Sequence, residues 1–105
     1  MNSEKLRNAE RLEISFETAG FELGTTAEKI QAELRKRTGS DRVHVTDLYW
    51  FKPVRRYQID VRVDRFPGDT RAPFKTVFAI QRDDIESMLN FATGWLNGLV
   101  LNPRA

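Results

Sequence analysis

The chain has 105 residues but contains no cysteine and a single histidine. Disulfides, thiolate nucleophiles and cysteine metal sites are therefore excluded. The sequence also lacks the glycine-rich phosphate loops, the HExxH metal pair and the GxSxG nucleophile elbow that identify common catalytic sites. Without these signatures, the sequence favours a protein that is not an enzyme and that uses no cofactor and no metal.

Long apolar runs are missing as well. The longest near-apolar stretch, residues 88–101, is interrupted by Asn90, Thr93 and Asn97, and it is shorter than the roughly 20 apolar residues that cross a bilayer. Residues 1–11 alternate in charge without an apolar segment, so we expect no secretory signal. The sequence therefore predicts a cytoplasmic protein with no membrane partner.

What remains is the composition of an ordinary globular protein, 40% hydrophobic and 30% charged. Its length predicts a single domain over residues 1–105, with residues 1–10 flexible. The net charge is only +2, but residues 40–82 carry nine basic and five acidic side chains. The positive charge is therefore concentrated on the central segment.

The start of the chain is ambiguous. Leu12, Ile14 and Phe16 alternate with polar residues, which predicts a strand over residues 12–17. A helical spacing through Leu6, Ala9 and Leu12 competes with this interpretation.

Residues 25–38 have the pattern of a short amphipathic helix. Thr25 and Glu28 have the spacing of a capping box, and Gly39 suits the left-handed position after the last turn. The apolar stripe is narrow, which predicts light packing; it consists of Ala27, Ile30 and Leu34.

Three strands are predicted next, over residues 42–51, 54–64 and 74–80. Their short connections, the turn at Lys52–Pro53 and the loop 66–73, predict an antiparallel meander. Alternation is clearest in the middle strand, where one face consists of Tyr57, Ile59, Val61 and Val63.

A final helix is predicted from Asp83 or Asp84, either of which suits its N-cap, to Leu99. Its core stripe consists of Ile85, Met88, Leu89, Ala92, Leu96 and Leu99.

Phe91 and Trp95 widen this stripe to an arc of about 180° at 100° per residue. A helix that covers a sheet needs little more than about 100°. Gly94 and Gly98 on the same flank would let another backbone approach closely. The flank therefore predicts a partner surface, although burial of Trp95 in the chain's own core would explain the same pattern.

The predicted order is β-α-β-β-β-α, which indicates an α+β two-layer sandwich with a mainly antiparallel sheet and helices on one face. From Thr25 onward this order resembles that of double-stranded-RNA-binding domains. Those domains place lysines at the start of their last helix, where this chain has Asp83, Asp84 and Glu86. We therefore do not assign the chain to that family.

Strand parity predicts which side chains share the outer face of the sheet. If the strand over residues 42–51 is unbroken, Tyr49 and Phe51 face the core with Val43 and Val45. The outer face then combines apolar with basic side chains, namely Leu48, Trp50 and Val77 with Arg56, Arg62 and Lys75. A β-bulge near Asp47 would instead turn Leu48 and Trp50 inward.

Two candidate sites for catalysis have simpler explanations. His44 alternates with Val43 and Val45, so we expect it on the outer sheet face without the orienting partner that a general base needs. Asp83 and Asp84 are explained by helix capping.

Two functions fit this pattern. The first is a non-catalytic protein-interaction module, a homodimer or an adaptor, that uses the outer face or the flank with Phe91 and Trp95. The alternative is nucleic-acid binding, in which Trp50 stacks on a base while Arg56, Arg62 and Lys75 contact phosphates.

Overall fold

The structure is a computed structural model that describes residue 20 and residues 22–100. Its main elements are α3 (Ala27–Thr38), β1 (Val43–Phe51), β2 (Arg56–Val63), β3 (Phe74–Ile80) and α4 (Ile85–Val100). The predicted α+β class is confirmed for this part of the chain, but the described order, α-β-β-β-α, differs from the predicted one. The predicted first strand, residues 12–17, and the segment 1–10 lie outside the described residues.

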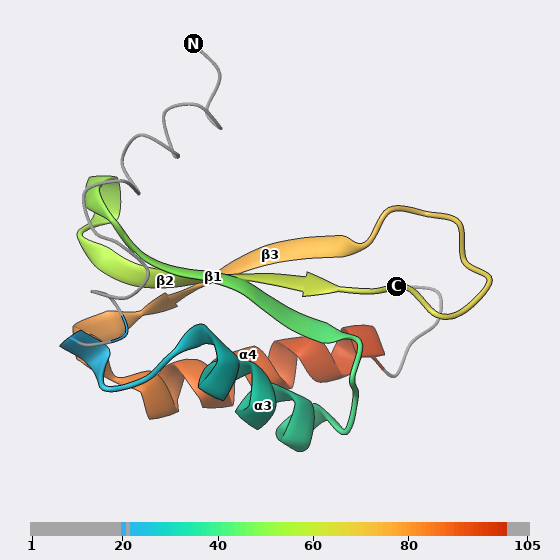
Figure 1. Ribbon diagram of the computed structural model, residues 1–105, viewed down its shortest axis with the longest axis horizontal. Helices are drawn as coiled ribbons and strands as arrows, with labels where there is room; N and C mark the ends of the chain where they lie inside the picture. The colour runs from blue at the N-terminus through green and yellow to red at the C-terminus, as the bar shows by residue number, and fades with distance from the viewer. Residues whose placement is uncertain (1–19, 21, 101–105) are drawn as a thin grey trace, which may run out of the picture.

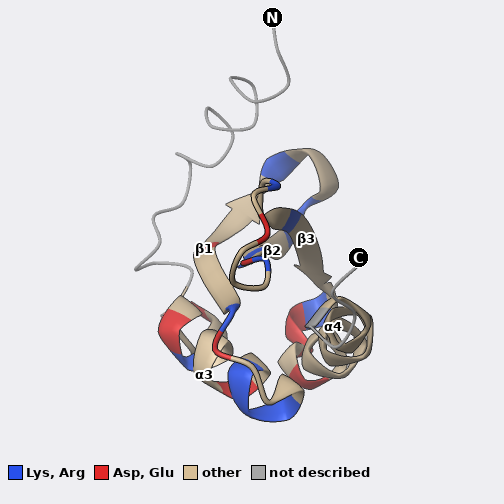
Figure 2. Cartoon of the chain, turned by 90° about the vertical axis from the view of Figure 1, so that its right-hand side faces the viewer, with Lys and Arg blue, Asp and Glu red and all other residues tan. Residues whose placement is uncertain are grey.

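The three strands form one antiparallel sheet in the order β1-β2-β3. Both helices lie on the same side of this sheet, α3 beneath β1 and α4 beneath β3 (Figures 1 and 2). The layers are those of the predicted two-layer sandwich, and the other side of the sheet carries none of the described helices (Figure 1). β3 is an edge strand of the described sheet.

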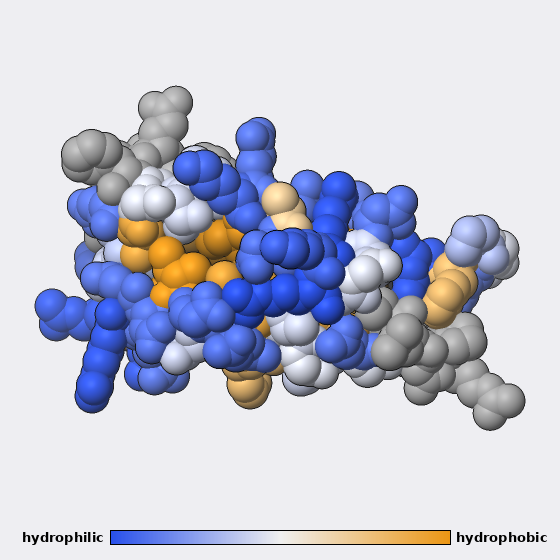
Figure 3. Space-filling model, turned by 90° about the horizontal axis from the view of Figure 1, so that it is seen from below, coloured by the Kyte–Doolittle hydropathy of each residue, from blue (hydrophilic) through white to orange (hydrophobic). Residues whose placement is uncertain are grey.

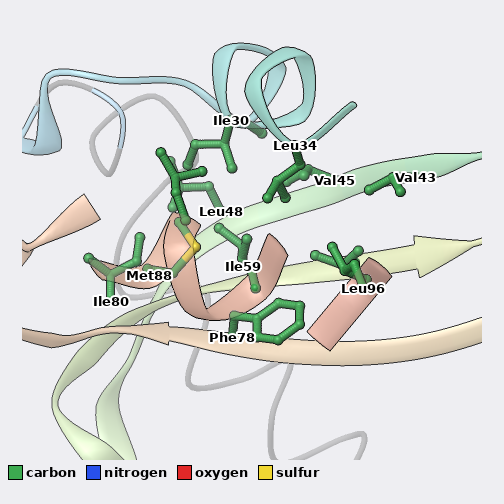
Figure 4. Close-up of a cluster of buried hydrophobic side chains, with 14 of the residues drawn as sticks. Ile30, Leu34, Val43, Val45, Leu48, Ile59, Phe78, Ile80, Met88 and Leu96 are labelled. Carbon is green, nitrogen blue, oxygen red and sulfur yellow. The ribbon is translucent and has the colours of Figure 1, made fainter. Parts of the chain in front are cut away.

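The core fills the space between the helices and the sheet (Figure 4). Ile30 and Leu34 of α3 meet side chains of β1, and Met88 and Leu96 of α4 meet Phe78 of β3 in one cluster. The predicted inner residues of β2 and the predicted stripes of both helices are buried or packed against this cluster.

Local signals explain most of the boundaries. Thr26, rather than Thr25, is the N-cap of α3, and its hydroxyl accepts a hydrogen bond of 3.2 Å from the Lys29 amide. The capping box predicted between Thr25 and Glu28 is therefore not formed. Gly39 ends the helix with a φ of 65°, as predicted.

The strand β2 begins later than predicted. A 3₁₀ turn, η1, covers Lys52–Val54, and Arg55 follows it in the left-handed region with a φ of 53°. These residues reverse the chain between β1 and β2, so the second strand starts at Arg56 instead of Val54.

A β-bulge in β1 overturns the unbroken-strand prediction. The register of β1 with β2 shifts between Val45 and Asp47, so Leu48 pairs with Ile59 and Trp50 pairs with Tyr57. Because one extra residue inverts all later side chains, Leu48 is fully buried in the core and Trp50 packs against it.

The same bulge places Tyr49 and Phe51 on the outer face, opposite to the unbroken-strand prediction. Tyr49 is nevertheless buried, and its hydroxyl lies 2.7 Å from Asp60 Oδ1 and 3.1 Å from Gln58 Oε1. Tyr49 is thus a buried, hydrogen-bonded residue on the sheet face that carries no helix among the described elements.

Candidate interaction surface

The bulge separates the residues of the predicted basic and aromatic face. Arg56, Arg62 and Lys75 project from the outer face, as predicted; Arg62 pairs with Lys75 in the register of β2 and β3. Trp50 lies on the opposite face, where its ring meets the Tyr57 ring edge-on with centroids 5.1 Å apart. Trp50 is therefore not placed to stack on a base beside these cations.

The charges at one end of the outer face are arranged as a chain. Arg35 Nη2 donates to His44 Nδ1 over 3.0 Å, and because an arginine can only donate, the ring proton lies on Nε2. His44 Nε2 then donates to Asp64 Oδ2 over 2.7 Å, and Arg62 Nε donates to Asp64 Oδ1 over 3.1 Å. Arg62 is thus held by a carboxylate of its own chain.

Asp64 is the centre of this chain of charges. Partial burial acts to raise its pKa, but the hydrogen bond from His44 and the positive charge of Arg62 outweigh that effect and hold the pKa of Asp64 below its ordinary value. Asp64 therefore stays ionised at neutral pH and neutralises part of the positive charge predicted for this face.

His44 does have orienting partners, which corrects the prediction that it lacks them. Both ring nitrogens are occupied, since Nδ1 accepts from Arg35 and Nε2 donates to Asp64. No lone pair remains to take a proton from a substrate. The arrangement ties α3 to the sheet and offers no general base.

Of the two acidic residues before α4, Asp84 is explained by the cap. Asp84 Oδ1 accepts from the Ser87 amide over 3.0 Å, and Oδ2 accepts from the Ser87 hydroxyl over 2.7 Å. These two hydrogen bonds lower the pKa of Asp84. Residue 20 and residues 22–100 contain no cluster of three or more histidine and acidic side chains that could hold a metal ion.

Phe91 and Trp95 form an exposed aromatic pair on the flank of α4. Phe91 is 68% exposed and Trp95 is 46% exposed, so the alternative in which Trp95 is buried in its own core is wrong. Both rings contact the buried Phe78 of β3 edge-on, with centroids 6.0 Å and 5.8 Å away. The inner edges of the pair are fixed by the core, while much of their surface faces outward.

Two glycines complete this flank. Residues 91, 94, 95 and 98 follow the spacing of one helix face, and all four are exposed. A Cβ atom added at Gly94 or Gly98 would meet nothing within 4 Å apart from the helix's own backbone and chain neighbours. We call Phe91, Gly94, Trp95 and Gly98 the α4 flank. It presents two fixed aromatic rings beside two positions where another backbone can approach.

A groove opens beside Phe91, between α4 and the edge strand. It has a volume of about 510 Å³ and is lined by residues 77–79 of β3, by Gln81 and Arg82 of the connection, and by Asp84, Ser87, Met88 and Phe91. No pattern in the sequence predicts this groove, because it exists only where the end of β3 meets the first turns of α4. Arg82 lines the groove, and its backbone adopts the left-handed conformation, with a φ of 53°.

On the helix side of the molecule, apolar surface also reaches solvent. Figure 3 shows an apolar area on this side with hydrophilic side chains around it. None of the described helices is long and apolar enough to span a membrane. Exposed apolar area with a polar rim is typical of surfaces that bind other proteins.

Comparison of the chain with models of protein families, with curated proteins and with solved structures gave no match.

Proposed function

We propose that this protein is a non-catalytic interaction module that self-associates as a homodimer through the α4 flank. The proposal rests on one observation, the exposure of Phe91 and Trp95 side by side on a helix whose adjoining face already fills the core. An amphipathic helix that only covered a sheet would carry polar residues at these positions.

The α4 flank suits a symmetric contact. In a two-fold dimer the same patch occurs on both copies, so each aromatic ring can pack against the partner's backbone at a glycine. Gly94 and Gly98 provide that approach, because no described side chain fills the space beside them. Aromatic side chains also contribute much of the binding energy in the cores of protein interfaces.

The distribution of charge supports the same surface. α4 has a single charged residue, Glu86, among its 16 residues. Two copies can therefore approach along the flank without placing like charges opposite one another.

Light scattering after gel filtration tests the proposal on the full chain at tens of micromolar. We expect twice the monomer mass of 12.2 kDa for the wild type. Trp95→Glu should return the mass to that of the monomer, because a carboxylate would be desolvated in the interface. The matched control is Ala32→Glu, which adds the same charge to an exposed position of α3; it should remain dimeric.

Substitution at a glycine separates association from folding. Gly94→Ala should stabilise the fold by up to about 1 kcal/mol, because alanine favours the helix more than glycine does. The same methyl group should weaken the dimer by holding the two backbones apart. A wild-type protein of monomer mass would overturn the proposal, as would a dimer that Trp95→Glu and Gly94→Ala leave intact.

A further inference from the structure

The groove between β3 and α4 lies beside the α4 flank but is a different surface. Only Phe91 belongs to both. One wall is formed by residues 77–79 of β3 and the other by the first turns of α4, with Phe78 and Met88 providing apolar surface. Phe91 stands at its rim and is 68% exposed. The groove therefore combines apolar and polar lining residues and lies beside an edge strand.

The edge of β3 is open to strand addition. No other described strand pairs with its outer side, and its pairing with β2 is regular from Phe74 to Ile80. Edge strands are commonly protected by charges, prolines or bulges. β3 has no bulge and no proline, and Lys75 is its only charged residue. Its outward backbone groups can thus pair with an extended segment.

One charged side chain of the groove, Arg82, has no partner among the described residues. Arg82 and Asp84 are the charged residues in the lining. Asp84 uses both carboxylate oxygens to cap α4, whereas exposed Arg82 has no hydrogen bond or ion pair with another of the described residues. The neighbouring Asp83 is not part of the lining. A ligand that enters the groove therefore meets an available guanidinium, which binds a carboxylate well.

We propose that this groove binds an extended peptide segment of another protein, which adds to the edge of β3, places an apolar side chain against the exposed side of Phe91, and pairs a carboxylate with Arg82. Strand addition supplies main-chain hydrogen bonds, and the groove supplies specificity for one side chain of the segment. The proposal goes beyond self-association, because it assigns a ligand to residues outside most of the α4 flank.

The test uses the full chain and fluorescein-labelled heptapeptides that have valine or leucine at alternate positions. One set carries aspartate at either end and a matched set carries lysine. Fluorescence anisotropy should show binding of the aspartate set, and amide shifts in NMR spectra should cluster at residues 77–79 and Phe91. Peptides with and without an amidated C-terminus distinguish a terminal carboxylate from an acidic side chain as the group that Arg82 binds.

Charge reversal provides the specific readout. Arg82→Glu should weaken binding of the aspartate set about tenfold and strengthen binding of the lysine set. Phe91→Ser should weaken both sets, because it removes apolar surface at the rim. Arg82 is exposed, so the substitution should leave the unfolding midpoint nearly unchanged, and a folded variant can be compared directly with the wild type.

Trp95→Glu keeps this test separate from that of self-association. The variant should bind the aspartate set like the wild type, whether or not the wild type is a dimer. The proposal is overturned if no peptide binds the wild type or Trp95→Glu, or if Arg82→Glu changes the affinity for both peptide sets equally. It is overturned as well if the amide shifts lie outside residues 77–79 and Phe91. It is also overturned if, without peptide, raising the concentration of Trp95→Glu shifts the amide signals of residues 77–79, since the groove would then hold a second copy.

Discussion

The helices α3 and α4 pack against the same face of the sheet, but their outer surfaces differ. Their inner faces are alike, with Leu34 of α3 and Leu96 of α4 both fully buried. α3 is charged outside its core face, and on the side that meets α4 Arg37 pairs with Glu33 and Glu86. The outer side of α4 carries the aromatic rings and glycines of its flank. Because one apolar face is enough to hold each helix, the second apolar surface of α4 is free for the proposed self-association.

The largest effect on stability is expected from substitutions in the inner faces of α3 and α4, and it tests whether the two faces contribute equally to the core. Leu34→Ala and Leu96→Ala should each lower the free energy of unfolding by about 2–5 kcal/mol, because each leaves a cavity in the core. Urea denaturation at low protein concentration measures this loss without a contribution from association. Phe91→Ala is the control on the same helix, and its cost should be about 1 kcal/mol or less. A small loss at Leu96 would contradict the idea that α4 is an integral part of the core.

The inner faces were also the part of the fold that the sequence predicted best. Apolar residues at helical spacing identified both stripes, and alternation in β2 identified its buried side. These signals are local, so they can be recognised in the sequence without knowledge of the neighbouring elements. Loop residues with strong turn preferences likewise placed β3 at Phe74–Ile80, as observed.

The bulge in β1 could not be located in the same way. Leu48 and Trp50 occupy one face beyond the bulge and Tyr49 and Phe51 the other, so both registers bury apolar residues. The choice depends on contacts across strands, such as the hydrogen bonds of Tyr49 to Gln58 and Asp60. For the same reason the α4 flank was predictable from helical spacing, whereas the groove and the role of Arg82 depend on how β3 meets α4.

An intermediate effect on stability is expected from substitutions at the N-caps of the two helices. α3 is capped by the neutral Thr26, and α4 by the carboxylate of Asp84. Thr26→Ala should cost about 1 kcal/mol at every pH. Asp84→Asn keeps a good cap but removes the titrating group.

The pH dependence of Asp84 follows from its lowered pKa. Hydrogen bonds from Ser87 hold this pKa in the folded protein below the ordinary value of 3.8, so the unfolded chain binds the proton more readily. The stabilising contribution is therefore complete above about pH 4 and is lost as the pH falls through the folded pKa. Thermal unfolding followed by circular dichroism between pH 7 and pH 2 should show a shallower acid loss for Asp84→Asn than for the wild type. Parallel profiles for these two proteins would contradict the assignment of the cap.

The smallest expected effect concerns the polar contact between the helices. Arg37 donates to Glu33 over 2.9 Å and reaches across to α4, where it donates to Glu86 over 2.8 Å and to Asn90 over 3.0 Å. Because Glu86 is 66% exposed, water and salt screen this pair. A double-mutant cycle with Arg37→Met and Glu86→Gln should give a small favourable coupling that disappears in high salt.

This contact also bears on the difference between the outer surfaces. Glu86 and Asn90 lie on the side of α4 that meets α3, about 110° around the helix from the middle of the α4 flank at 100° per residue. Arg37→Met should therefore leave the mass measured by light scattering unchanged. If it produced a monomer, association would depend on the charged side of α4 and not on Phe91 and Trp95. An unchanged mass, together with the loss of the dimer in Trp95→Glu, would confine self-association to the aromatic side of the helix.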